Sequence, residues 1–189
     1  MKKPIISIVG AGGMVGGEIL DIIEKRKIPF KEMLFFGSGR RVKYVAFKNK
    51  KHPLQKPSIQ ELKKSDIVFF VSSDEVSKRF AKKLSSLGVW CIDDSSAFRM
   101  DRDVPLVIPE INGKEVTEKT KLISGPNCTL TPLAVSCYKI SRKYGIREIR
   151  MATYQAVSGA GRRAVGEFIS EIKSFIETGK VKRRDKILP

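Results

Sequence analysis

A short apolar run, a glycine-rich turn and an amphipathic segment follow one another directly at the start of the chain. Residues 4–9 are almost wholly apolar, as a central parallel strand is, and residues 10–17 (GAGGMVGG) supply the turn. Residues 18–27 then show helical periodicity. Glycines in this setting let the backbone approach a pyrophosphate at a helix N-terminus, so the order predicts a dinucleotide-binding turn. A flexible connection between strand and helix is the alternative.

Apolar runs and amphipathic patterns alternate along the rest of the chain. Further strands are predicted at residues 31–36, 44–47, 66–72, 89–92, 104–108, 122–123 and 146–157. Helices are predicted at residues 59–64, 75–87, 133–144 and 163–178. This alternation is typical of a parallel, doubly wound sheet. We therefore expect an α/β fold, with a Rossmann-like domain over residues 1–127 and the start of a second, α+β domain over residues 128–189.

The chain is strongly basic. It has 37 lysines and arginines against 20 aspartates and glutamates, a formal net charge of +17. An excess of this size makes nucleic-acid binding a rival hypothesis. The basic residues are spread over predicted loops and helix faces without aromatic residues between them, however, which is typical of a solvated lysine-rich surface. We therefore expect an anionic small molecule, rather than nucleic acid, as the partner.

The apolar runs and the cysteines indicate in which compartment the protein works and whether it binds a metal. No apolar run approaches the length of about 20 residues that a membrane helix needs. The first ten residues begin like a signal peptide, but they lead into the glycine turn without a small-residue cleavage site. Cys91, Cys128 and Cys137 have neither paired nor metal-ligand spacing, which fits a reducing compartment. We expect a cytoplasmic protein with no metal and no membrane partner. The single histidine, His52, is expected in an exposed polar loop.

The end of the second predicted strand indicates which dinucleotide the chain prefers. A cofactor with a free ribose 2′-hydroxyl usually meets a carboxylate at this position. Here residues 36–43 contain no carboxylate, but they do contain Ser38, Arg40 and Arg41. Guanidinium groups match phosphate oxygens, so this composition favours NADP over NAD. A basic hairpin turn is the alternative.

Cys128 lies in residues 124–132 (SGPNCTLTP), between an apolar run and the helix predicted at residues 133–144. Pro132 suits the first helical turn, and Thr129 or Thr131 can cap it. A thiol at the positive end of a helix is favoured as the reactive thiolate. The alternative is a buried cysteine that serves only as a small apolar residue.

Several motifs, in this order along the chain, resemble those of aspartate-semialdehyde dehydrogenases. They are the glycine turn at 10–16 and the residues 95–100 (SSAFRM), 103–112 (DVPLVIPEIN), 125–129 (GPNCT) and 153–161 (TYQAVSGAG). The resemblance implies an oxidoreductase that reduces L-aspartyl 4-phosphate to L-aspartate 4-semialdehyde with NADPH, in lysine, threonine and methionine biosynthesis. N-acetyl-glutamyl-phosphate reductases look similar, but they typically carry glycine where this chain has Asn127.

The resemblance also implies roles for individual residues. Cys128 is the nucleophile that forms an acyl-thioester, and Gln155 orients the substrate beside it. Arg99 holds the phosphate, and Asn127 helps to position the site. The cofactor-binding residues implied are Gly10, Gly12, Gly13, Met14, Val15 and Gly16 under the pyrophosphate, Ser38, Arg40 and Arg41 near the 2′-phosphate, and Ser158 and Gly159 near the nicotinamide.

The chain departs from the family pattern in three places. Asp74 and Glu75 stand where the family has small, glycine-rich residues, and they would either repel a pyrophosphate or cap the next helix. Asp94 replaces the usual asparagine. Family members also continue well past residue 189, and that part carries the catalytic histidine, a substrate-binding arginine and much of the homodimer interface. We therefore expect this chain alone to be a nearly inactive portion of the enzyme, or a catalytically silent NADP-binding module.

Overall fold

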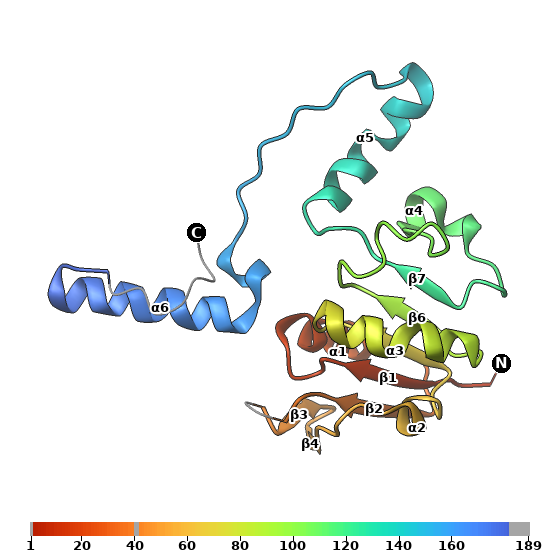
Figure 1. Cartoon of the computed structure of the whole chain (residues 1–189), viewed down its shortest axis with the longest axis horizontal. Helices are drawn as coiled ribbons and strands as arrows, with labels where there is room; N and C mark the ends of the chain where they lie inside the picture. The colour runs from red at the N-terminus through yellow and green to blue at the C-terminus, as the bar shows by residue number, and fades with distance from the viewer. Residues whose placement is uncertain (1, 40–41, 182–189) are drawn as a thin grey trace. The chain divides into compact units, whose positions relative to one another are not determined.

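The computed structural model describes residues 2–39 and 42–181, and a five-stranded parallel sheet forms its centre. The strands lie in the order β2-β1-β5-β6-β7 (Figure 1). Their bounds are Ile5–Val9 for β1, Glu32–Phe36 for β2, Ile67–Phe70 for β5, Trp90–Asp93 for β6 and Leu122–Ser124 for β7. The chain steps from β1 outward to β2 and then crosses to β5 on the other side of β1. This confirms the predicted doubly wound α/β fold.

Both faces of the sheet are covered. Neighbouring residues on each strand point to opposite sides, so a single strand contributes to a core cluster on each face. Val9 belongs to a core cluster that contains Phe80 and Leu84 of α3 (Asp74–Ser86). Ile8 belongs to a second cluster that contains residues of α1 (Met14–Lys25) and of the adjoining hairpin. The near-continuous apolar sequence of β1 follows from this double burial.

The helices follow the predictions closely. In addition to α1 and α3, they are α2 (Ile59–Leu62), α4 (Pro109–Asn112), α5 (Leu130–Tyr144) and α6 (Gly161–Thr178), with short 3-10 turns at Gly113–Glu115 and Val157–Ala160. Left-handed glycines after α5 and α6 end both helices, with φ of 74° at Gly145 and 67° at Gly179. No helix in residues 2–39 or 42–181 combines the length and the apolar composition needed to cross a membrane.

His52 was predicted in an exposed polar loop, but it lies in a strand. β3 (Tyr44–Phe47) and β4 (Lys50–Pro53) form an antiparallel hairpin in which His52 pairs with Val45. The imidazole is half-buried, with its ring centroid 4.8 Å from that of Phe35. Lys50 and Lys51 before His52 and Pro53 after it made the segment look like a loop, whereas ring packing holds the imidazole in place.

Two segments predicted as strands form no strand within the described residues. In residues 104–108 only Leu106 pairs, in a single bridge with Ser124, because Pro105 lacks an N–H and Pro109 already begins α4. Residues 146–157 pair with no strand of the described chain, although their apolar spacing resembles that of one. A strand needs a partner edge, and local spacing does not supply one.

The chain divides into two compact units, residues 1–149 and residues 150–189. The sheet, the hairpin and α1 to α5 belong to the first unit, and α6 belongs to the second. α6 presents an exposed apolar face with the spacing of one helical stripe, formed by Phe168, Ile169, Ile172, Phe175 and Ile176.

Candidate functional site

The carboxyl ends of β1 and β5 meet where the strand order reverses, the position at which open α/β sheets bind ligands. Gly10 follows β1 there with φ of 101°, and its N–H donates to the carbonyl of Phe36 at 2.9 Å. A Cβ on Gly10 would lie 2.3 Å from the carbonyl oxygen of Val71. Only glycine fits, so the backbones of the two strand ends come close together here.

The turn between β1 and α1 has the properties of an anion-binding turn. A Cβ on Gly16 would lie 2.5 Å from the carbonyl oxygen of Gly10, so the first turn of α1 packs directly on the glycine turn. Gly13 is the N-cap, no acidic residue lies in the first turn of α1, and Met14 and Val15 are exposed. A helix N-terminus of this kind presents its N–H groups and positive dipole end to an anion. The turn between β1 and α1 therefore fits a dinucleotide pyrophosphate.

Asp74, one of the two departing carboxylates, binds a neighbouring loop. Its Oδ1 accepts a hydrogen bond from the N–H of Ser96 at 3.0 Å, and its Oδ2 accepts one from the Ser96 hydroxyl. The hydroxyl contact is the largest cause that lowers the pKa of Asp74. Asp74 and Glu75 both lie in the first turn of α3, where negative charge is favourable. The N-cap of α3 is Ser73, so neither carboxylate caps the helix from that position.

A buried carboxylate closes the end of β6. Oδ1 of Asp93 accepts a hydrogen bond from the Ser77 hydroxyl at 2.6 Å, and Oδ2 accepts one from the Ser95 hydroxyl at 2.8 Å. Its carbonyl accepts the N–H of Gly125 at 2.7 Å, so the ends of β6 and β7 are joined. Asp93 is not among the residues predicted from sequence; the available signal was a carboxylate at the end of an apolar strand, two residues before a pair of serines.

Arg99 bridges the loop after β6 to the loop after β7. Its Nε donates to the carbonyl of Gly125 at 2.9 Å, and its Nη2 donates to the carbonyl of Asp94 at 2.9 Å. Desolvation raises the pKa of the Asp94 carboxyl, and the nearby guanidinium partly offsets that rise.

Cys128 is exposed on the turn between β7 and α5. The turn is organised by Asn127, whose carbonyl accepts the N–H groups of Leu130 and Thr131 at 3.0 and 3.1 Å. The predicted threonine cap is wrong. Thr129 occupies the N-cap position, but its hydroxyl donates to Oδ1 of Asn127. The structure thus brings Cys128, Asn127 and the Arg99–Gly125 contact into one cluster at the carboxyl edge of the sheet.

The other predicted site residues lie in two further parts of the chain. Gln155, Ser158 and Gly159 belong to the second compact unit, where a Cβ on Gly159 would lie 2.3 Å from Nε2 of Gln155. Arg40 and Arg41 lie outside the described residues, and Ser38 is exposed just before them.

Comparison with known proteins identifies the relatives of this chain. Residues 5–119 match the family model described as semialdehyde dehydrogenase, NAD binding domain. An aspartate-semialdehyde dehydrogenase of Aquifex aeolicus is 37% identical over 96% of this chain and 54% of its own length. One from Synechocystis sp. is 36% identical over 100% of this chain and 56% of its own.

A solved structure agrees with these relatives. The crystal structure of aspartate semialdehyde dehydrogenase II of Vibrio cholerae, complexed with ASA, superposes with a TM-score of 0.88 at 28% identity. The superposition covers 100% of this chain and 56% of that one. The chain thus spans about half the length of the relatives it matches. It belongs to the semialdehyde dehydrogenase family, and its parallel sheet carries the family's NAD(P)-binding domain.

Proposed function

We propose that this chain forms the cofactor-binding part and the nucleophile of an NADP-dependent aspartate-semialdehyde dehydrogenase. The reaction is the reductive dephosphorylation of L-aspartyl 4-phosphate to L-aspartate 4-semialdehyde, in lysine, threonine and methionine biosynthesis. The observation that carries the proposal is the exposed Cys128 at the carboxyl edge of the sheet, on a turn organised by Asn127 and tied to Arg99 through Gly125. The similarity to aspartate-semialdehyde dehydrogenases supports the substrate class.

The chemistry assigned to Cys128 is nucleophilic acyl transfer. The thiolate attacks the acyl carbon of the substrate, a carbon–sulfur bond forms, the carbon–oxygen bond to phosphate breaks, and inorganic phosphate leaves. Bound NADPH would supply the hydride that reduces the resulting thioester. Cys128 then departs as thiolate, and the aldehyde is released.

Arg99 and Gln155 are proposed to hold the substrate. Arg99 has five N–H donors and uses two of them on the carbonyls of Gly125 and Asp94. We assign the remaining donors to the substrate phosphate, for which guanidinium geometry is suited. Asn127 keeps the turn in place, and Gln155 is assigned to the substrate carbonyl or carboxylate.

The cofactor is assigned to the glycine turn. Residues 10–16 would hold the pyrophosphate, and Ser38 with Arg40 and Arg41 would hold the 2′-phosphate of NADP. Ser158 and Gly159 are assigned to the nicotinamide. On this assignment the cofactor-binding domain covers residues 1–127, and residues 128–189 begin the catalytic and dimerisation domain.

The whole reaction requires more than this chain. It spans about half the length of its relatives, and its one histidine lies in the hairpin, with Nε2 3.3 Å from the carbonyl oxygen of Phe47. We therefore propose that the 189-residue chain binds NADP but turns over little substrate, and that the full-length form is a cytoplasmic homodimer.

Cofactor titration tests this assignment. The fluorescence of NADPH and of NADH is followed as the protein is added, with the doubly substituted chain Arg40→Ala/Arg41→Ala beside the parent. NADPH is expected to bind about tenfold more tightly than NADH, since one charge-assisted contact has roughly that value. The double substitution should remove the preference. Equal binding of the two cofactors by the parent chain would overturn the NADP assignment.

A further inference from the structure

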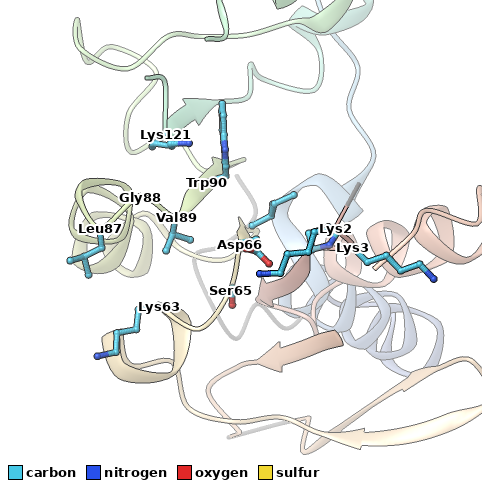
Figure 2. Close-up of a pocket in the computed structure, with 12 residues that line it drawn as sticks. Lys2, Lys3, Lys63, Ser65, Asp66, Leu87, Gly88, Val89, Trp90 and Lys121 are labelled. Atoms are coloured by element: carbon cyan, nitrogen blue, oxygen red, sulfur yellow. The ribbon is translucent and has the colours of Figure 1, made fainter. Parts of the chain in front are cut away.

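A cavity of about 540 Å³ opens at the amino-terminal edge of the parallel sheet. It lies beside the starts of β1, β5 and β6, at the end of the strands opposite to Cys128 (Figure 2). Its volume is within the usual range of small-molecule sites, about 300–1,000 Å³. The proposed reaction makes no use of this cavity.

Four lysines from three separate parts of the chain line this cavity: Lys2, Lys3, Lys63 and Lys121. None of them forms a salt bridge with a carboxylate within residues 2–39 and 42–181. The cavity's one carboxylate, Asp66, accepts the N–H of Ile5 at 2.7 Å through Oδ2. The lining therefore has an excess of positive charge, with its single negative group already hydrogen-bonded.

The rim of the cavity is held by backbone hydrogen bonds. The N–H of Asp66 donates to the carbonyl of Ile5 at 2.9 Å, and the N–H of Trp90 donates to the carbonyl of Asp66 at 3.0 Å. The carbonyl of Lys121 accepts the N–H of Cys91 at 2.7 Å. Nζ of Lys121 lies 4.5 Å from the ring centroid of Trp90, a cation–π contact. Lys121 and Trp90 are thus presented from fixed positions at the strand ends.

A neighbouring cavity of about 480 Å³ provides a contrast. It also includes lysines, but Nζ of Lys82 is 2.6 Å from Oδ2 of Asp101, and Asp103 lines the same space. That contact raises the pKa of Lys82 and lowers that of Asp101, as expected of a charge pair. An ion pair therefore offsets part of its positive charge, whereas none of the four lysines of the larger cavity forms an ion pair among the described residues; Lys121 lines both cavities.

We propose that the 540 Å³ cavity binds a small polyphosphate anion. Ammonium groups bind phosphate oxygens as point charges, and a lining with four lysines and one carboxylate suits a ligand with several negative charges. A nucleoside triphosphate and inorganic polyphosphate share this chemistry. The site is separate from the glycine turn, which lies at the opposite edge of the sheet.

The chain itself supplies the probe for a test. Trp90 is the only tryptophan of the sequence and lines this cavity, so emission excited at wavelengths that tyrosine does not absorb comes from the cavity's own residue. Sodium tripolyphosphate is titrated into the full chain at low ionic strength, and a saturable change in emission is expected. A parallel calorimetric titration measures affinity without relying on Trp90. ATP is titrated separately: tighter binding than tripolyphosphate assigns the site to a nucleotide, and equal binding assigns it to phosphate groups alone.

Matched variants decide whether the cavity is responsible. Lys63→Gln and Lys121→Gln should each weaken tripolyphosphate binding by about tenfold, because each removes one charge-assisted contact. Lys51→Gln, on exposed β4 and outside the cavity, should leave the affinity unchanged. The proposal is overturned if no saturable binding occurs at millimolar tripolyphosphate, or if Lys51→Gln weakens binding as much as the cavity variants do.

Discussion

Nε of Arg99 donates a hydrogen bond of 2.9 Å to the carbonyl of Gly125, three residues before Cys128. The same guanidinium reaches the carbonyl of Asp94 through Nη2, so it joins the loops that follow β6 and β7. These loops approach the proposed nucleophile from two different strands. Arg99 therefore supports the Cys128 turn in addition to its proposed contact with phosphate.

Replacing Arg99 by lysine should separate charge from geometry. Lysine keeps the positive charge but lacks the planar fork that reaches two carbonyls at once. We expect Arg99→Lys to lower the free energy of unfolding by about 1–2 kcal/mol, allowing for partial solvent exposure of the contacts. Chemical denaturation measures the change, with the exposed Arg102→Lys as the control. An equal effect of the two substitutions would show that the contact to Gly125 contributes nothing.

The two glycines Gly10 and Gly17 should respond to alanine in opposite directions. At Gly10 a new Cβ would lie 2.3 Å from the carbonyl oxygen of Val71, on a backbone with φ of 101°. Gly10→Ala should cost about 2–3 kcal/mol or more in stability. At Gly17, inside α1, a Cβ would meet nothing within 4 Å. Gly17→Ala should stabilise by about 0.5–1 kcal/mol. Urea unfolding of both variants provides the comparison, and tolerance of alanine at Gly10 would contradict the close approach of β1 and β5.

The contact between Asp74 and Ser96 should make stability depend on pH. The folded-state pKa of Asp74 is lowered below 3.8, chiefly by the Ser96 hydroxyl. A lowered pKa contributes stability that is present above 3.8 and is lost as the pH falls through the folded-state value. In a double-mutant cycle, Asp74→Asn and Ser96→Ala should therefore be coupled at pH 7, and the coupling should decrease toward pH 3. Coupling that stays constant with pH would mean that the charge of Asp74 is not involved.

The exposed apolar face of α6 should make the chain self-associate and bind hydrophobic dyes. Phe175 and Ile176 are 55% and 77% exposed, at the end of the same helical stripe as Phe168 and Ile172. A patch of this kind marks a surface that another segment or chain covers. Phe175→Glu with Ile176→Glu is expected to reduce both self-association in analytical ultracentrifugation and binding of the dye ANS. The exposed polar variant Lys173→Glu is the control, and equal behaviour of all three proteins would contradict this expectation.

The sheet was predictable from sequence because its signals are local. The apolar run of β1, the glycine turn and the periodicity of α1 lie within one short stretch, and all three elements form there, although α1 begins at Met14, inside the predicted turn, rather than at residue 18. The segments that failed depend on distant partners. Residues 146–157 have strand-like spacing but no partner edge among the described residues, and His52 is placed by packing on Phe35.

The site could be predicted in part. The resemblance pointed to Cys128 and Arg99, and the structure places both in loops at the carboxyl edge of the sheet, where the proposed function needs them. The contact between Arg99 and Gly125 spans 26 positions, and the bond from Ser77 to Asp93 spans 16. Such contacts depend on how strands stack side by side, so spacing along the chain did not reveal them.

Selective alkylation of Cys128 tests whether this cysteine is the nucleophile of the proposed reaction. The chain is treated with iodoacetamide at pH 8, and each cysteine peptide is quantified by mass spectrometry over time. Cys91 is buried, and burial raises its pKa to about 12, so it serves as the internal unreactive control. Cys137 is half-buried and serves as an intermediate one.

We expect Cys128 to be alkylated at least about tenfold faster than Cys137, since an exposed thiol near a helix N-terminus reacts readily. NADPH together with a phosphonate analogue of L-aspartyl phosphate should slow this reaction. Cys128 that is no more reactive than Cys137 and is unprotected by these ligands would contradict its role as the nucleophile.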